Sequence, residues 1–357
     1  GRKVTMYASL LMMGISTSII GILPPVASAG VGVVIVLQLM RLAQCFGRGG
    51  TWGGGILMAY ENVPENKRSF YAAIPQIGLP IGFGLSSILI AVPTLLLPED
   101  IFFTWGWRIP FLAAIILTLI VIRQKGEMME TEDYKKAQAK LEAEEAEGKK
   151  HKVGFIPMVK GYWKTLLLGC GTRWVDGTFY NIFIVWILSY CINWLGMPLI
   201  QTYIITIIAC IFKIPFTLFG GWCAQKLGNT RTFVIGALAS AVLSIPTLKV
   251  IELSKGNLAI TIIGIVLGWS IAYNLIWAVI SSLWSSYFET EVRYSGISFV
   301  YHVPSFLVAG MVPTICTLLI NYGKGDTIYV GIYSTVVALI SAACALALKA
   351  RHDRGEK

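Results

Sequence analysis

Charged residues are scarce in this sequence. Only 13% of its 357 residues are Asp, Glu, Lys or Arg, whereas a soluble domain typically carries about 25%. Hydrophobic residues make up 55% of the chain, which excludes an ordinary soluble enzyme. Long aliphatic runs accompanied by many aromatic residues also exclude a disordered chain, a collagen and a small disulfide scaffold. Apolar surface in this amount requires a lipid bilayer.

Paired metal or redox ligands are missing too. The seven cysteines are scattered singly through apolar segments, so we expect reduced, packed thiols and no metal site. The glycine-rich stretch GRGGTWGGG lacks the Lys-Ser/Thr ending of a nucleotide loop and follows no predicted strand. The three histidines, at 151, 302 and 352, form no cluster along the chain. We therefore expect no cofactor, and a membrane-bound enzyme is disfavoured.

Long apolar segments dominate what is present. A membrane-spanning helix needs roughly 20 consecutive apolar residues. By this criterion the sequence predicts an all-α membrane protein with ten spans, two of them over-long and tilted or broken. They cover residues 4–22, 31–60, 70–96, 103–122, 162–194, 199–222, 232–251, 258–283, 296–320 and 329–348.

The basic residues lie mainly on one side of the predicted membrane. The connections on the side of the N-terminus carry 21 Lys and Arg, and those on the opposite side carry three. The positive-inside rule makes the first side cytoplasmic, including the charged linker and the C-terminus. The net charge of +10 therefore reflects topology in a cell inner (cytoplasmic) membrane, and we expect no nucleic-acid partner.

An internal correspondence relates the two halves of the chain. ENVPENKRSF at 61–70 aligns with SYFETEVRYS at 286–295, which pairs Arg68 with Arg293, and GRK at 1–3 resembles GNTR at 228–231. Two spans precede GNTR whereas none precedes GRK, so we expect two further helices at the front and a plan of six plus six helices in parallel repeats. The predicted organisation is an N-terminal half (1–122), a linker (123–161), a C-terminal half (162–348) and a tail (349–357).

Parallel helical repeats are typical of secondary transporters, whose substrate site lies at mid-membrane between the halves. Such a protein would be a monomer in the bilayer and carry a small-molecule metabolite. A receptor that binds its ligand without accumulation is an alternative from another class.

Five motifs stand out along the chain: the opening GRK, RLAQCFGRGGTWGG at 41–54, YENVPENKRSFYAAIPQIGLPIG at 60–82, WGWRIPF at 105–111 and EVRYSG at 291–296. Together and in this order they resemble the major facilitator superfamily, specifically its metabolite:proton symporter branch. Relatives in this branch carry shikimate, 2-oxoglutarate, citrate, or proline and betaine. The resemblance implies symport driven by the proton gradient with alternating access. Cys45 and Thr51 depart from the branch pattern, and Thr51 replaces an intramembrane glutamate.

Charges inside spans are functional hypotheses by default, because burying them in lipid is costly. Arg41 and Arg48 are seven residues apart on one helix face. The resemblance maps the family's RxxQ arginine to Arg41 and implies gating or proton relay, and the alternative is pairing with a backbone carbonyl. Arg173, Asp176 and Tyr180 also share a face. Asp176 is the one carboxylate deep in a span, and it is either a proton relay or the static partner of Arg173.

Other polar side chains complete the predicted substrate site. Lys213 lies on the order of 10 Å inside the cytoplasmic end of its span, where it either contacts substrate or snorkels. Asn181 and Gln76 are candidate partners for substrate hydroxyls. Because the deep charges sum to a positive value, we expect an organic anion. An anion exchanger or facilitator of the same fold, and an osmolyte symporter for betaine or proline, stay open.

A cytoplasmic gate is implied by the family resemblance. Its salt bridges would involve Arg2, Lys3, Glu61, Arg68, Glu291 and Arg293. The alternative is that these charges are solvated loop ends, which contribute little.

Overall fold

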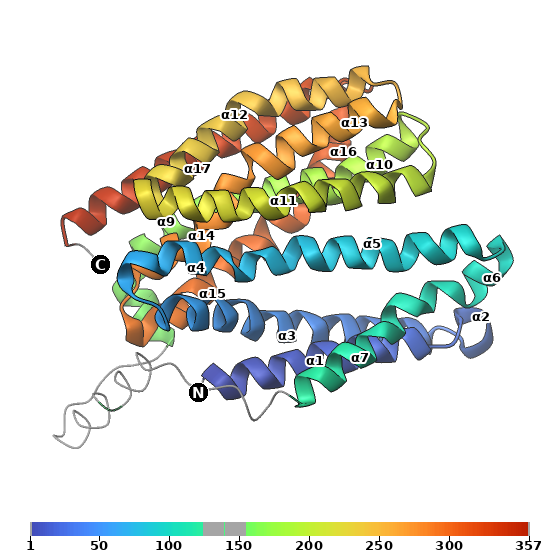
Figure 1. Cartoon of the computed structure of the whole chain (residues 1–357), viewed down its shortest axis with the longest axis horizontal. Coiled ribbons are helices and arrows are strands. Elements are labelled where there is room, and N and C mark those ends of the chain that lie inside the picture. The colour runs from blue at the N-terminus through green and yellow to red at the C-terminus, as the bar shows by residue number, and fades with distance from the viewer. Residues whose placement is uncertain (1, 124–138, 140–154, 356–357) are drawn as a thin grey trace.

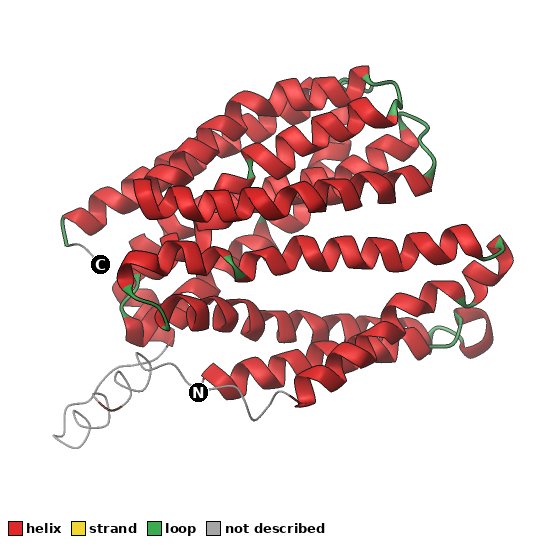
Figure 2. Ribbon diagram, viewed as in Figure 1, coloured by secondary structure: helices red, strands yellow, loops and turns green. Residues whose placement is uncertain are grey.

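A computed structural model describes residues 2–123, 139 and 155–355. The predicted all-α architecture is confirmed for these residues, which form helices joined by short loops (Figure 2). The predicted linker at 123–161 falls largely outside the described residues.

The first group of helices runs from α1 to α7. Its elements are α1 (Arg2–Ile22), α2 (Val26–Ala29), α3 (Gly32–Glu61), η1 (Glu65–Lys67), α4 (Arg68–Ala73), η2 (Pro75–Ile77), α5 (Gly78–Leu96), α6 (Glu99–Thr104), η3 (Gly106–Arg108) and α7 (Ile109–Arg123). Within it, α1 packs along both α3 and α7.

The second group runs from α9 to α17. Its elements are α9 (Phe155–Tyr180), η5 (Asn181–Trp186), α10 (Ile187–Asn193), α11 (Leu199–Leu227), α12 (Asn229–Leu253), α13 (Leu258–Ile265), η6 (Val266–Ala272), α14 (Asn274–Tyr287), α15 (Thr290–Leu307), η7 (Ala309–Met311), α16 (Val312–Tyr322) and α17 (Ile328–Asp353). The most extensive packing here joins α17 to α12 and α9.

Nine segments of the described chain are long and apolar enough to cross a membrane. They are Val4–Ile22, Glu65–Leu96, Gly106–Arg123, Pro157–Asn193, Leu199–Leu227, Asn229–Leu253, Leu258–Tyr287, Val292–Tyr322 and Ile328–Asp353. The remaining predicted span, residues 31–60, corresponds to α3, which has 30 residues and is therefore long enough to cross a membrane. Its glycines and two arginines lower its mean hydropathy.

Several predicted spans are broken where the sequence suggested continuous helices. The predicted span 70–96 is divided into α4, η2 and α5, because Pro75 cannot donate a backbone hydrogen bond. The predicted start at Phe103 is wrong, since Phe103 belongs to α6 and Trp105 leaves helical geometry before η3 begins. In the second group, η5 and η6 are π-helical segments that interrupt the predicted spans 162–194 and 258–283.

Two helix ends have clear local causes. The α1 helix ends at Ile22 before the pair Pro24 and Pro25, and Arg108 from η3 donates hydrogen bonds to the carbonyls of Gly21 and Leu23. This cation stabilises the negative end of the helix dipole. It anchors η3 to α1, consistent with a structural role for Arg108.

The two groups lie side by side, with α5 and α11 running along each other at their boundary (Figure 1). We call the end of the bundle where α7 ends and α9 begins the linker end, and the opposite end the far end. Side chains of α4 and η2 meet α14 between the groups. Gln76 Nε2 donates to the Trp277 carbonyl at 3.3 Å, and Trp277 Nε1 donates to the Gln76 carbonyl at 3.1 Å.

Candidate functional site

A buried acid lies at the centre of the second group. Asp176 on α9 is 1% exposed, and its two carboxylate oxygens accept hydrogen bonds from Arg173 Nη1 and from the Tyr273 hydroxyl. Arg173 is one helical turn away on the same face, as the spacing predicted. A carboxylate removed from water is tolerable when it is paired and hydrogen-bonded, and both conditions are met here.

The elements around this acid are irregular helices. Tyr180 is the last residue before the π-helical η5, and Tyr273 directly follows the π-helical η6. Such segments shift the register of the side chains and are frequent at functional sites. The Tyr273 ring also stacks on Phe179 with centroids 6.1 Å apart, which fixes the direction of its hydroxyl toward Asp176.

Arg173 connects the acid to the first group of helices. Its guanidinium lies over the Tyr301 ring at 4.3 Å, and its Nη2 donates to Ser305 Oγ at 3.3 Å. Tyr301 on α15 in turn stacks on Trp52 of α3, with centroids 4.0 Å apart. We call Arg173, Tyr301 and Trp52 the stacked triad. It joins the buried acid to a helix of the other group.

Further polar groups surround this point between the two groups. Arg48 on α3 has an exposed side chain and interacts electrostatically with both Tyr180 and His302. His302 follows Tyr301 on α15 and contacts the backbone of Gly49. The half-buried Tyr180 meets Phe83 of α5 edge to face at 5.8 Å. Arg48 and Tyr180, both predicted, therefore lie near one another.

Lys213 is fully buried on α11. Its ammonium lies over three aromatic rings, 4.4 Å from the Trp269 centroid, 4.3 Å from Tyr273 and 6.0 Å from Trp277. The predicted snorkelling is wrong in this conformation, because the side chain is 0% exposed. Tyr273 thus contacts Lys213 through its ring and Asp176 through its hydroxyl.

The remaining predicted substrate residues are placed differently. Arg41 has an exposed side chain and donates to Gln44, which donates to Thr17 of α1. Asn181 donates to the Gly177 carbonyl of its own helix. Gln76 is 2% exposed and bonded to Trp277 as described above. These three side chains contact protein groups away from Asp176, whose contacts are with Arg173 and Tyr273.

Three of the residues predicted to form a gate, Glu61, Arg68 and Arg293, lie together at the linker end. Arg293 Nη1 lies 3.1 Å from Glu61 Oε1, joining α15 to the end of α3, and the Glu61 side chain is 0% exposed. Arg68, which the repeat pairs with Arg293, lies over the same Tyr60 ring, at 5.3 Å against 5.7 Å for Arg293. Arg68 also meets the exposed Glu65 at 3.5 Å.

The side chains of three other predicted gate residues, Arg2, Lys3 and Glu291, lie outside what the structure describes. A hydrogen bond also joins the same two helices: the Tyr294 hydroxyl of α15 donates to the Gly50 carbonyl of α3 at 3.2 Å.

A second charged cluster lies at the far end. Lys249 Nζ on α12 is 3.0 Å from Glu252 and 2.7 Å from Asp326, and Glu252 accepts hydrogen bonds from the amide and hydroxyl of Thr327. The hydrogen bonds from Lys249 and from the Ile328 amide hold the pKa of the Asp326 carboxyl below its ordinary value. This cluster fixes the loop between α16 and α17 and stands apart from the buried acid.

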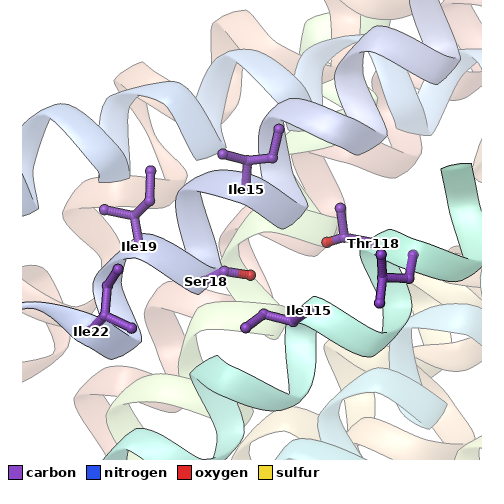
Figure 3. A pocket seen from close by; sticks show the side chains of 7 residues that line it. Ile15, Ser18, Ile19, Ile22, Ile115 and Thr118 are labelled. Carbon is purple, nitrogen blue, oxygen red and sulfur yellow. The ribbon is translucent and has the colours of Figure 1, made fainter.

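A pocket between α1 and α7 is not part of the site (Figure 3). It is lined by aliphatic side chains together with Ser18 and Thr118, and both hydroxyls donate to carbonyls of their own helices. A surface of this kind suits lipid tails. Within the described ranges, no group of three His, Cys, Asp or Glu residues comes together as possible metal ligands.

Comparison with known proteins decides the family. A model of the Major Facilitator Superfamily matches residues 1–309. The chain belongs to this superfamily. A structure of the proton:xylose symporter bound to 6-bromo-6-deoxy-D-glucose has a TM-score of 0.74 at 16% identity, over 97% of this chain and 79% of that one. The facilitator fold expected from the motifs is therefore confirmed, and the protein is a multi-pass membrane transporter rather than an enzyme.

The curated relatives are bacterial transporters. An inner membrane metabolite transport protein of Escherichia coli is 32% identical over 99% of this chain and 79% of its own length. The shikimate transporter of the same organism is 30% identical over 98% and 78%. A proline/betaine transporter of Salmonella typhimurium is 27% identical over 99% and 70%.

Sequence reasoning missed the aromatic partners of the site. Tyr273, Tyr301 and Trp52 carry no net charge, so no search for charges in apolar spans selects them. His302 was noted only as one of three isolated histidines. The signal that would have found it is its position beside Tyr301 on the span that follows the EVRYSG motif.

Proposed function

We propose that this transporter of small metabolites carries an organic acid together with protons. The observation that supports the proposal is the buried carboxylate of Asp176, which accepts hydrogen bonds from Arg173 and Tyr273. Lys213 lies over the Tyr273 ring, and Arg48 lies near Tyr180. A carboxylate in apolar surroundings is stabilised by a cationic partner when it is ionised and needs no such partner when it is protonated. Its two protonation states therefore prefer different partners. Cations around it attract an anionic substrate, and Arg173 can bind a carboxylate with two parallel hydrogen bonds.

We propose further that access alternates by movement of one half of the chain against the other. The halves are residues 1–122 and 162–348, joined by a linker at 123–161, and the tail at 349–357 shares the linker's side. The contacts of Glu61 with Arg293, and of Trp52 with Tyr301, would close the linker end and separate when it opens. In this proposal the linker and C-terminus are cytoplasmic, the protein works as a monomer, and the proton gradient replaces any cofactor.

The test is uptake of labelled 2-oxoglutarate, citrate, shikimate and glycine betaine into proteoliposomes, with and without an inward proton gradient. We expect one acid to accumulate against its gradient and a protonophore to abolish the accumulation. Accumulation of betaine alone would replace the organic acid by an osmolyte. Exchange that does not depend on the proton gradient would indicate that the protein is an exchanger or a facilitator and not a symporter.

The role of Asp176 is tested by Asp176→Asn, which keeps the shape and one hydrogen-bond acceptor but cannot take up a proton. We expect gradient-driven accumulation to fall to the equilibrium level while exchange of internal and external substrate continues. Asp326→Asn is the matched control, because it removes an acid from the far end of the bundle, and it should leave accumulation unchanged. Full accumulation by Asp176→Asn would exclude Asp176 as the proton carrier.

A further inference from the structure

The aromatic enclosure of Lys213 has an unusual chemical property. The ammonium is 0% exposed and faces the rings of Trp269, Tyr273 and Trp277, yet none of the described residues accepts a hydrogen bond from its Nζ. A primary ammonium carries three donors and loses free energy when they are left unpaired in an apolar environment. The enclosure therefore offers ring faces that suit a cation but no acceptor for N–H groups.

These rings are better suited to a quaternary ammonium group. Aromatic faces attract a cation through their quadrupole, most strongly when the pair is desolvated. A tetraalkylammonium ion has no N–H group, so it needs no acceptor, and its methyl groups gain from contact with apolar rings. Aromatic enclosures without acceptors are the usual way in which proteins recognise such ions.

The enclosure shares a wall with the proposed proton site. The ring of Tyr273 lies beneath Lys213 while its hydroxyl donates to Asp176. Trp269 belongs to the π-helical η6 and Trp277 to α14, so the segment that orients Tyr273 also builds the enclosure. A ligand in the position of the Lys213 side chain would therefore lie next to the acid.

We propose that the Lys213 side chain fills a quaternary-ammonium site and thereby excludes such compounds from the transporter. Lys213 is then a specificity residue, and the vacated enclosure binds small quaternary ammonium ions. This role rests on the proposed function, because it explains why a transporter of organic acids would not carry quaternary ammonium compounds. The binding property itself does not depend on transport.

The test compares two substitutions that remove the same amino group. Lys213→Ala deletes the side chain beyond Cβ, which is close in size to tetramethylammonium, and opens the enclosure. Lys213→Met keeps it filled with an uncharged chain of similar length. Binding of tetramethylammonium to purified protein in detergent is followed by tryptophan fluorescence at constant ionic strength, because two rings of the enclosure are indoles.

We expect Lys213→Ala to bind tetramethylammonium at least about tenfold more tightly than the native protein or Lys213→Met, which corresponds to 1.4 kcal/mol. The uncharged analogue neopentyl alcohol (2,2-dimethylpropan-1-ol) should not compete. Lys213→Ser gives the same opening with a polar side chain and is used if the alanine variant does not fold. Equal binding by all variants, or equal gain by Lys213→Met, overturns the proposal.

Transport separates this inference from the proposed function. If Asp176→Asn loses proton-driven uptake while neither Lys213→Ala nor Lys213→Ser binds tetramethylammonium, symport is supported and the quaternary-ammonium site is excluded. If Lys213→Ala binds tetramethylammonium but transport does not depend on the proton gradient, the quaternary-ammonium site is supported and symport is excluded. Uptake of glycine betaine by the native protein, with Lys213 in place, would also overturn the exclusion role.

Discussion

Breaking the bridge between Glu61 and Arg293 should open the linker end of the transporter. The two side chains are 3.1 Å apart, with side-chain exposures of 0% for Glu61 and 11% for Arg293. Glu61→Gln removes the negative charge that the guanidinium of Arg293 faces at 3.1 Å in a buried position. In a conformation with this end open, both groups are hydrated, so the substitution penalises the closed conformation selectively.

The size of the effect follows from the burial. Removing one partner of a buried ion pair typically costs 3–5 kcal/mol, whereas exposed pairs contribute about 0–1 kcal/mol. The Gln side chain still offers an oxygen to Arg293, so we take the lower limit, about 3 kcal/mol. Since each 1.4 kcal/mol is tenfold, the ratio of closed to open conformations should fall by roughly 10².

Spin-label distances measure this ratio directly. Labels at the exposed positions Asn66 and Asp353, in a variant without native cysteines, report the separation of the two groups at the linker end. Glu61→Gln should shift the distribution to longer distances, and the exchanged pair Glu61→Arg with Arg293→Glu should restore it. The control Glu65→Gln removes an exposed carboxylate from the same end and should change nothing. An unchanged distribution in Glu61→Gln would refute the gate.

Two further predictions concern stability in detergent. Gly221→Ala should lower the free energy of unfolding by about 1–3 kcal/mol, because its Cβ would lie 2.7 Å from a side-chain atom of α4. In the control Gly82→Ala the new Cβ has nothing within 4 Å, so this variant should be neutral or stabilising. Equal thermal shifts in the two variants would contradict this reasoning. Asp326 has a lowered pKa in the folded protein, so its bridge to Lys249 stabilises the fold above the ordinary Asp pKa of about 3.9 and is lost as pH falls through the lower folded value. Asp326→Asn should therefore melt below the native protein at neutral pH and converge with it in acid, and a constant difference down to pH 2 would contradict the assignment.

The spans were predictable because their signal is composition over long windows. Nine of the ten spans predicted from uncharged runs coincide with membrane-length helical segments of the described chain, and the helical spacing of Arg173 and Asp176 predicted their contact. Interruptions of the spans were not predictable in the same way. The π-helical segments before Ile187 and Tyr273 have no signature in an apolar run.

The candidate site was predictable only in its charged members. Tyr273 lies 97 residues from Asp176 along the chain, and Ser305 lies 132 residues from Arg173. No local spacing links positions so far apart. Burial of Lys213 among aromatic rings was likewise hidden, because Trp and Tyr at helical spacing are equally typical of an ordinary core. Charged side chains within the spans indicate candidate site positions, and tertiary packing decides which of these side chains come into contact.

The stacked triad gives the proposed proton step a physical route to the gate. Arg173 has three partners, the Asp176 carboxylate, the Ser305 hydroxyl and the Tyr301 ring, and only the first changes its charge on protonation. Neutral Asp176 attracts the guanidinium less, so the balance shifts toward Tyr301 and any substrate carboxylate. Tyr301 is stacked on Trp52, and Trp52 lies on the helix that ends at Glu61.

A route of contacts becomes a coupling only if both of its ends bias one two-state element. The packing of α15 against α3 is that element in the proposed mechanism, because it holds the ring stack of Trp52 with Tyr301 and the ion pair of Glu61 with Arg293. Protonation of Asp176 acts on the first contact and opening of the linker end breaks the second. Since both contacts join the same pair of helices, loosening one lowers the free energy needed to separate the other.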